Sequence, residues 1–388
     1  GASATIDALT RSATRATYGL RARCKEFGVH SMHMQTQLFD VLVSPILTYG
    51  SEVWGPALLH GATSPDTMLN KGGGAQQLQA TFLRAVAGGV RASTSRPLLL
   101  REFGVEAIVQ KWLMAAVQLW NRAHDREQGD LLRAVLAENL ALSVAGDEPQ
   151  RCRLWGAQMR KLLQLVGVDT STGMPQLQPL QPSVVLSSFH VWFHAAWQGL
   201  PFNPRAAPEG QGLLCTYDRW FAASSVVGHG GGMADSGGGR RKVPLPDVVL
   251  NTAGINREHV GTLMRFRLGA HDLRVATGRW QRPQPPPRAE RVCQRCQQGV
   301  VEDEFHAVFE CSRYRRLRLH QRFACLFARF DAPTAQRPLH MLLFMAQQTA
   351  ILAAFLHACW LIRCCKKEEL ELMGVVLPDE FWSSINAE

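Results

Sequence analysis

Hydrophobic residues recur at helical spacing along most of this chain. The clearest case is Val105–His124, whose apolar face comprises Ile108, Trp112, Ala116, Leu119, Trp120 and Ala123. Gly88-Gly89 is a typical end signal for a helix over Gln76–Ala87. The same spacing predicts further helices over Gln35–Thr48, kinked or ended at Pro45, and over 129–143, 150–166 and 184–199.

Few segments favour other structure. The best strand candidates are Tyr49–Trp54 and the turn around Cys293–Cys296, because Val, Trp and Tyr tolerate extended geometry. Residues 61–75 are predicted to form a loop. The proline-rich segment Gln281–Arg288 predicts a stiff linker that holds the following residues away from the preceding segment.

The composition fits a folded chain with reduced thiols. Its 388 residues, 46% of them hydrophobic, are enough to bury two or three cores. Ten cysteines without secretory features favour metal ligation over disulfides, and hence a nuclear or cytoplasmic location. The chain starts with Gly and no signal segment follows, so we expect a fragment of a longer reading frame. The apolar stretch Leu339–Ile362 is interrupted by Gln347, Gln348 and His357, which predicts a buried amphipathic helix and no membrane partner.

The most informative pattern is Cys293-x2-Cys296-x9-His306-x4-Cys311. Zinc takes four ligands at tetrahedral corners; a C-x2-C turn supplies two of them from one backbone bend, and the His-x4-Cys pair closes the site. We predict that these four residues bind one structural Zn²⁺. The alternative is that some are ordinary buried thiols, but the polar sequence QRCQQG favours zinc. His320 and Cys325 repeat the x4 spacing in an apolar stretch without a C-x2-C partner, and are not expected to bind metal.

The residues around this motif are strongly basic. Between Arg257 and Arg322 there are fourteen arginines and seven acidic residues, which accounts for most of the formal net charge of +10. A single helix after Cys311 would place Leu319, Phe323, Leu326, Phe327 and Phe330 opposite an acid-free stripe of Arg315, Arg318, Arg322 and Arg329. Such a stripe indicates a phosphate track, with a solvated face as the alternative and codon bias as another source of arginine.

We therefore expect RNA or DNA as the partner. The candidate contacts are Arg279, Trp280, Arg291, Arg295, Tyr314, Arg315, Arg318 and Arg322. Arginine grips phosphate in two places, and the two aromatic rings are available to stack on unpaired bases. Packing of both rings against Phe305 and Phe309 is the alternative.

These features predict a mostly α fold in three parts: a helical bundle, a disordered glycine-rich linker, and a small basic zinc-knuckle module with C-terminal helices, over 1–223, 224–242 and 243–388.

Two regions resemble the reverse transcriptases of non-LTR (LINE-type) retrotransposons. LFDVLVSPILTYGSEVWGP (38–56) and TFLRAVAGGVRASTSRPLLLREFGVEAIVQKWLMAAVQLWNR (81–122) are similar to the segment after the polymerase palm. RFRLGAHDLRVATGRW (265–280), the Cys-x2-Cys pair, VEDEFH (301–306), and Cys311 with Tyr314 and Arg318 are similar to the C-terminal zinc-knuckle region. The order agrees, whereas 126–254 matches only in helical character.

The resemblance implies a thumb- or connection-like helical region and a parent protein that is an RNA-directed DNA polymerase with an upstream palm domain. Two-metal polymerisation needs clustered carboxylates, and the chain has no Asp-Asp pair. Pro378-Asp379-Glu380 faintly echoes a nuclease site, but no Lys follows at suitable spacing. We therefore expect no enzyme activity from this chain.

Two function classes remain. One is a nucleic-acid-binding module that grips template RNA or target DNA for an upstream polymerase domain. The other is a zinc-stapled helical protein-interaction or relic domain that does not bind nucleic acid. Salt distinguishes them, because phosphate binding releases counterions and weakens steeply with ionic strength.

Overall fold

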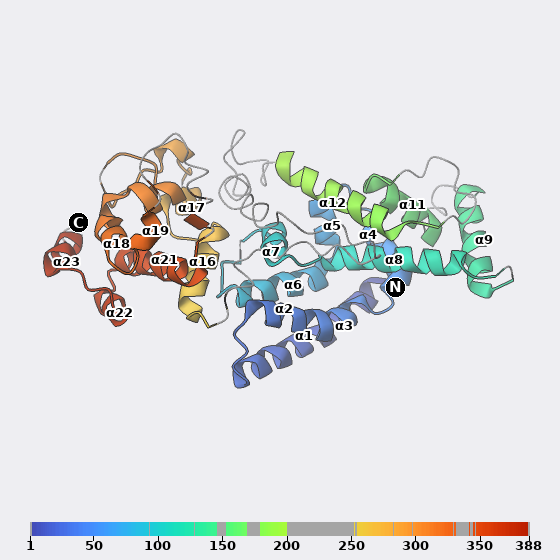
Figure 1. The fold of residues 1–388 in the computed structure, drawn as a ribbon. Coiled ribbons are helices and arrows are strands. Elements are labelled where there is room, and N and C mark those ends of the chain that lie inside the picture. Colours follow the sequence, from blue (N-terminus) through green and yellow to red (C-terminus); the bar gives the residue numbers. More distant parts are fainter. Residues whose placement is uncertain are drawn as a thin grey trace.

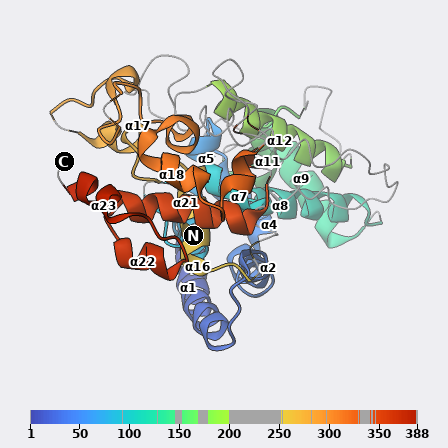
Figure 2. The ribbon, with the colours of Figure 1, turned by 60° about the vertical axis from the view of Figure 1, so that its left-hand side comes forward.

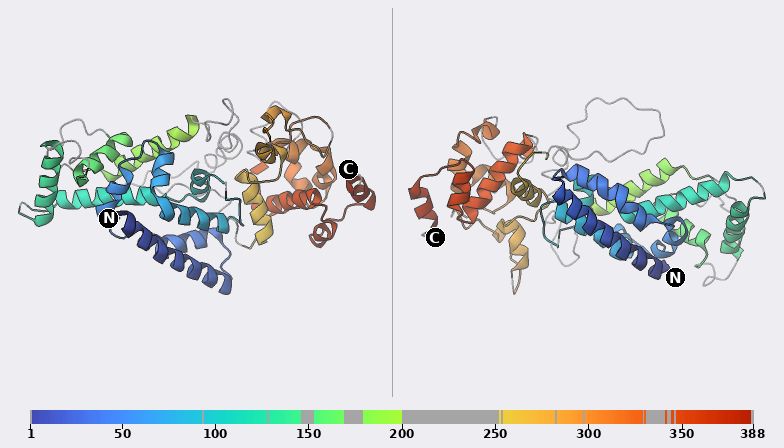
Figure 3. Two further views of the ribbon diagram at one scale, coloured as in Figure 1. Left: turned by 180° about the vertical axis from the view of Figure 1, so that it is seen from behind. Right: turned by 90° about the horizontal axis from the view of Figure 1, so that it is seen from below.

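The computed structural model describes residues 2–145, 153–168, 179–199, 252–330 and 341–386, apart from positions 93, 128, 253, 282, 297, 329, 342–343 and 346. Within these residues the fold is mostly α, which confirms the predicted fold class, and the β pairing is a single antiparallel bridge between Val292 and Val301. A helical bundle built from the N-terminal residues lies beside a smaller C-terminal module (Figures 1 and 3). The linker predicted over 224–242 lies outside the described residues.

The bundle is formed by helices that precede residue 200. They are α1 (Ala2–Glu26), α2 (Met32–Leu42), α3 (Ser44–Thr48), α4 (Ser51–Leu59), α5 (Pro65–Lys71), α6 (Gly73–Val86), α7 (Arg96–Phe103), α8 (Ile108–His124), α9 (Leu131–Ala145), α11 (Trp155–Leu165) and α12 (Pro182–Gly199).

Helix α8 is the centre of the bundle. Its apolar face buries Trp112 and Trp120 completely, as the helical spacing predicts. The indole nitrogen of Trp112 donates to the carbonyl of Leu47 at 2.9 Å, so the buried polar atom is satisfied. Helix α4 crosses α8 closely because Gly55 leaves room for the Cβ of Trp112.

Two local predictions in the bundle are corrected, and the predicted break in the helix at Pro45 is confirmed. Tyr49–Trp54 is no strand: α3 ends at Thr48, Gly50 takes a positive φ of 65°, and α4 starts at Ser51. The ring of Trp54 packs edge-on against Trp112 at 4.9 Å, and this packing outweighs β propensity. The predicted loop 61–75 contains α5, because Ser64 and Thr67 form a capping box around the helix start and Pro65 takes the first helical position. Pro45 starts α3 as well as ending the preceding helix.

The C-terminal module is built from short helices and turns around one long helix. Its elements are α16 (Arg257–Arg267), α17 (Arg274–Thr277), η2 (Gly278–Trp280), η3 (Arg288–Glu290), η4 (His306–Glu310), η5 (Ser312–Tyr314), α18 (Arg315–Leu319), α19 (Ala324–Phe327), α21 (Thr349–Arg363), α22 (Lys367–Leu372) and α23 (Asp379–Asn386).

Helices α16 and α21 pack side by side and form the module's main helix pair (Figures 1 and 2). Helix α21 covers the C-terminal part of the apolar stretch 339–362 and buries the run Leu352–Ala358, including His357. In the described part of the chain, no helix is both long and apolar enough to cross a membrane.

Two predictions in the module are wrong. The basic stripe does not lie on one helix, because α18 ends at Leu319, the backbone of His320 is extended, and α19 starts at Ala324. The segment 281–288 does not separate the cysteine motif from the residues before it. The amide of Val275 donates to the backbone carbonyl of Glu302 at 3.1 Å, and the Arg291 side chain packs against Gly278.

The bundle and the module are joined by specific contacts. Arg267 of α16 forms an ion pair with Glu102 of α7, and both side chains are almost completely buried. Gly88 and Gly261 bring the two backbones together so closely that a Cβ on Gly88 would lie 2.5 Å from Gly261 Cα. Arg91 also pairs with Asp272 at 2.5 Å.

Candidate metal centre

Cys293 and Cys296 lie in the turn of a short hairpin. The amide of Cys293 donates to Val300 at 2.7 Å, and the amide of Glu302 donates to Arg291 at 2.9 Å. Gly299 closes the turn with a positive φ of 68°, a conformation that glycine adopts without strain. The hairpin thus presents both sulfurs on the same side of one bend.

His306 and Cys311 are placed by the turn that follows the hairpin. Asp303 accepts a hydrogen bond from the amide of His306 at 2.8 Å, which fixes the start of this turn. The amide of Cys311 donates to the carbonyl of His306 at 2.7 Å, the i to i+5 bond of a single π turn. The x4 spacing therefore brings the imidazole and the third thiol to the same point.

The structure brings together all four predicted ligands. Their ligand atoms all lie within 4.8 Å of one another, and the sulfur of Cys296 is 3.4 Å from Nε2 of His306. A tetrahedral site with Zn–S bonds of about 2.3 Å has ligand–ligand edges of about 3.8 Å. The group could therefore hold a metal ion. His320 and Cys325 are not part of it.

The negative charge of the group centres on Cys293, while the other three ligands hold their protons more tightly than usual. A hydrogen bond from Cys311 lowers the pKa of Cys293 to about 3, although burial acts in the opposite direction. The same contact, together with burial, raises the pKa of Cys311. Burial lowers the pKa of His306, but the hydrogen bond and charge of Cys293 outweigh it and raise that pKa. Such a site favours a cation, and metal binding would displace protons from it.

A buried carboxylate connects this centre to the rest of the module. Glu302 accepts hydrogen bonds from the amide of Arg274 at 2.7 Å and from both terminal nitrogens of Arg363 at 2.5 and 3.1 Å. The sulfur of Cys293 lies 3.6 Å from the same carboxylate. Glu302 therefore links the hairpin that carries Cys293 to α17 and to the last turn of α21, and Arg363 offsets its negative charge beside the sulfur.

The two acids that follow have other partners. Asp303 caps the turn of His306, while Glu304 accepts from Nε2 of His271 at 2.9 Å inside the core. Because the amide of Leu273 donates to Nδ1 of His271, the proton of this imidazole lies on Nε2. Burial raises the pKa of Glu304, but the His271 contact outweighs it and lowers that pKa. Glu302, Asp303 and Glu304 thus anchor the residues around the ligand turn through three different sets of partners.

Sequence reasoning missed Glu302, Glu304, His271 and Arg363 as supporting residues. The available signal was the run of three acids directly before a predicted ligand, in an otherwise basic region. Their partners are distant in the sequence, so the spacing could not identify them.

The two candidate stacking residues have different environments. Trp280 is 58% exposed, so its ring is accessible. Tyr314 is 2% exposed, and burial raises the pKa of its hydroxyl. The prediction that Tyr314 stacks on bases is therefore wrong, because its ring belongs to the core.

The candidate arginines also separate into two groups. Several donate to backbone carbonyls: Arg279 to Ala276, Arg291 to Val275 and Pro286, Arg318 to Val308 and Cys311, and Arg322 to Met373. Arg315 is exposed and Arg295 is half-buried. Arg318 thus stabilises the ligand turn, and the predicted stripe is not a uniform phosphate track.

Several basic residues lie near Arg279, the residue before Trp280. Burial and the charges of Arg291, Arg288 and Arg91 lower the pKa of Arg279, although the charge of Glu304 acts in the opposite direction and Arg91 also pairs with Asp272. The bonds of Arg279 and Arg291 go to neutral carbonyls and leave their charge in place. We call Arg91, Arg279, Trp280, Arg288 and Arg291 the Trp280 cluster.

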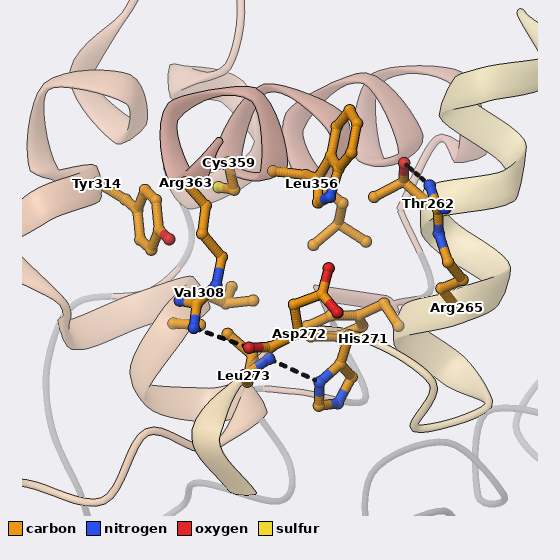
Figure 4. A pocket seen from close by; sticks show the side chains of 13 residues that line it. Thr262, Arg265, His271, Asp272, Leu273, Val308, Tyr314, Leu356, Cys359 and Arg363 are labelled. Carbon is orange, nitrogen blue, oxygen red and sulfur yellow. Dashed lines mark hydrogen bonds between the residues drawn. The ribbon is translucent and has the colours of Figure 1, made fainter. Parts of the chain in front are cut away.

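A cavity of about 60 Å³ lies between α16, α21 and the ligand turn. Figure 4 shows Arg363, Tyr314, Cys359 and Leu356 on one side and Thr262 with Arg265 on the other. A cavity of this size has room for a few water molecules. Its walls are mostly apolar side chains of the module core.

Comparison with protein-family models, with curated proteins and with solved structures finds no match to this chain.

Proposed function

We propose that the C-terminal module binds one Zn²⁺ and uses the Trp280 cluster to grip single-stranded nucleic acid. It does so as the C-terminal part of a non-LTR reverse transcriptase whose polymerase domain lies upstream. The observation that carries the proposal is the exposed indole of Trp280, which directly follows Arg279 and the basic residues near it, on a module with a Cys3His group. Aromatic rings among cations are typical of surfaces that bind unpaired bases and their phosphates.

Zinc is the metal that the donor set favours. Three thiolates and one imidazole suit a borderline-soft cation, whereas magnesium and calcium prefer oxygen ligands. Four protein ligands leave no open coordination position for water or substrate. The metal's role is therefore to hold the hairpin and the ligand turn together, and we expect no turnover at this site.

Binding of short labelled single-stranded RNA and DNA to the whole chain tests the proposal. Trp280→Ala should weaken binding by about 1–3 kcal/mol, the contribution of one stacked base. Arg288→Gln should also flatten the salt slope by about one unit if one phosphate contact is lost. Tyr49→Ala and Arg21→Gln are matched controls, because both residues are exposed on the bundle and are far in the sequence from Trp280 and Arg288.

A protein-interaction module is the second candidate. Large apolar side chains are exposed on α1, α2, α4 and the turns beside them, namely Tyr18, Phe27, Val41, Tyr49 and Val53. Exposed apolar surface of this kind favours protein contacts. Unchanged nucleic-acid affinity and salt slope in folded, zinc-loaded Trp280→Ala and Arg288→Gln variants would favour this candidate.

A further inference from the structure

The start of α7 collects positive charge without an acid. Its first helical residue is Arg96, there is no acidic residue in the first turn, and the N-cap Ser95 makes no side-chain capping bond. Arg84 of α6 donates to the carbonyl of Thr94 at 2.9 Å, which places a second guanidinium at the same helix start. The helix dipole adds partial positive charge at this end.

Three buried polar atoms at this helix start have no hydrogen-bond partner among the described residues. They are Nε of Arg84, Oγ1 of Thr94 and Oγ of Ser95. The exposed fractions of these residues are only 9%, 5% and 8%, so bulk solvent does not readily satisfy them. Buried polar atoms in proteins are almost always paired, so three unpaired donors at one helix start make it a candidate site for a ligand with acceptor atoms.

The charge at this point is also unpaired. Burial and the nearby charge of Arg96 lower the pKa of Arg84. Arg96 donates to the neutral side-chain oxygen of Asn70, and in the described part of the chain no carboxylate forms an ion pair with Arg84 or Arg96. A buried cation without a counter-charge is strongly unfavourable. An anion bound here would remove that cost.

We propose that the start of α7 is a binding site for a terminal or free phosphate group, held by Arg84, Arg96, Thr94 and Ser95. Phosphate oxygens accept from guanidinium groups and hydroxyls, which are the donors present, whereas Pro97 contributes no amide to this helix start. The dianion matches the two guanidinium charges. The burial of three of the four residues suits a terminal phosphate or inorganic phosphate, because an internal phosphodiester continues on both sides.

This site goes beyond the proposed function, since it lies in the N-terminal bundle and uses neither the metal ligands nor the Trp280 cluster. The two sources of its ligand are inorganic phosphate and the phosphorylated end of a nucleic-acid strand. They share the same oxygen chemistry, and the experiment below distinguishes them.

Inorganic phosphate is the first probe, used with the whole chain at neutral pH. Calorimetric titration should give saturable binding, and the unfolding temperature should be higher in phosphate than in chloride at equal ionic strength. Arg84→Gln and Arg96→Gln should each weaken phosphate binding about ten- to hundredfold, as expected for loss of a charge-assisted hydrogen bond. Arg21→Gln, an exposed arginine on α1, should leave it unchanged.

The second probe is a pair of oligonucleotides of one sequence, with a 5′-phosphate or a 5′-hydroxyl. Tighter binding of the phosphorylated strand, lost in Arg96→Gln, assigns the site to a nucleic-acid end. Phosphate binding without that preference assigns it to inorganic phosphate. If Arg84→Gln does not fold, Arg96→Gln and Thr94→Val provide the comparison.

Equal unfolding temperatures in phosphate and chloride would overturn the proposal, as would full phosphate binding by Arg96→Gln. The calorimetric readout contains no nucleic acid, so its failure is separate from failure of the proposed function.

Discussion

Arg363 holds Glu302 with both of its terminal nitrogens, at 2.5 and 3.1 Å, and the sulfur of Cys293 lies 3.6 Å from the same carboxylate. Burial opposes the charge on Arg363, yet the Glu302 contact outweighs it and raises the pKa of the guanidinium. The last turn of α21 thus contacts the metal ligands through one acid. Glu302 and Arg363 are 61 positions apart in the sequence, yet both lie beside the candidate metal centre.

We predict that Arg363→Gln weakens zinc binding about 10- to 100-fold, the usual cost of losing an outer-shell partner. The reason is that Glu302 would lose its counter-charge, and an uncompensated carboxylate 3.6 Å from the Cys293 sulfur opposes the thiolate form that binds a metal. Competition with a coloured chelator measures the affinity. Arg316→Gln, an exposed arginine on α18, is the control, and equal affinity in both variants would contradict the assigned role of Arg363.

Removal of the metal should unfold the ligand region and leave the bundle folded. A structural metal contributes folding free energy, so chelation or Cys296→Ser should release residues around 290–315. Hydrogen exchange should show lost protection there and retained protection in α8. Simultaneous loss of protection in α8 would mean that the bundle depends on the metal.

Replacing only one partner of the ion pair between Glu102 and Arg267 should strongly lower the free energy of unfolding. Glu102→Gln leaves a buried guanidinium without its counter-charge and should destabilise the chain by about 3–5 kcal/mol. Replacing both residues with Met should cost much less, because no uncompensated charge remains. Denaturant unfolding measures both variants. An additive double variant would show that the two side chains act independently.

Stability should fall in mild acid because of His357. Burial, with nearby His259 and Arg265, lowers the pKa of His357 from 6.5 to about 4. Thr262 donates its single hydroxyl proton to the backbone carbonyl of Glu258. In the neutral state, Nδ1 of His357 therefore donates to the hydroxyl oxygen of Thr262, at 3.0 Å.

The unfolded chain therefore binds more protons between these two pKa values, and stability present above pH 6.5 is lost as the pH falls toward 4. After allowance for solvent screening, the loss is on the order of 1–2 kcal/mol. His357→Gln should remove this component, so the stability difference from the parent chain should shrink with acid. A difference that is constant with pH would contradict the assignment.

The sequence by itself determined the features that depend on near neighbours. The four candidate metal ligands converge because each pair is separated by a single turn, so their spacing reports their geometry. The helical period of Ile108, Trp112 and Trp120 likewise predicted the buried face of α8. In both cases the physical cause acts over a few residues of backbone.

The tertiary structure decided the features that depend on distant partners. The propensities of Tyr49, Val53 and Trp54 favour a strand, but packing of Trp54 on Trp112 favours a helix. The pattern after Cys311 suggested one helix, yet Arg318 turns back to donate to the Val308 and Cys311 carbonyls.

The same division applies to charge. The arginines can be counted in the sequence, but their availability to a ligand cannot be inferred from it. Arg267 is neutralised by Glu102, Arg363 by Glu302, and Arg84 by no acid among the described residues. A charge is paired or unpaired according to what lies within a few ångströms after folding, and this is a property of the tertiary structure alone.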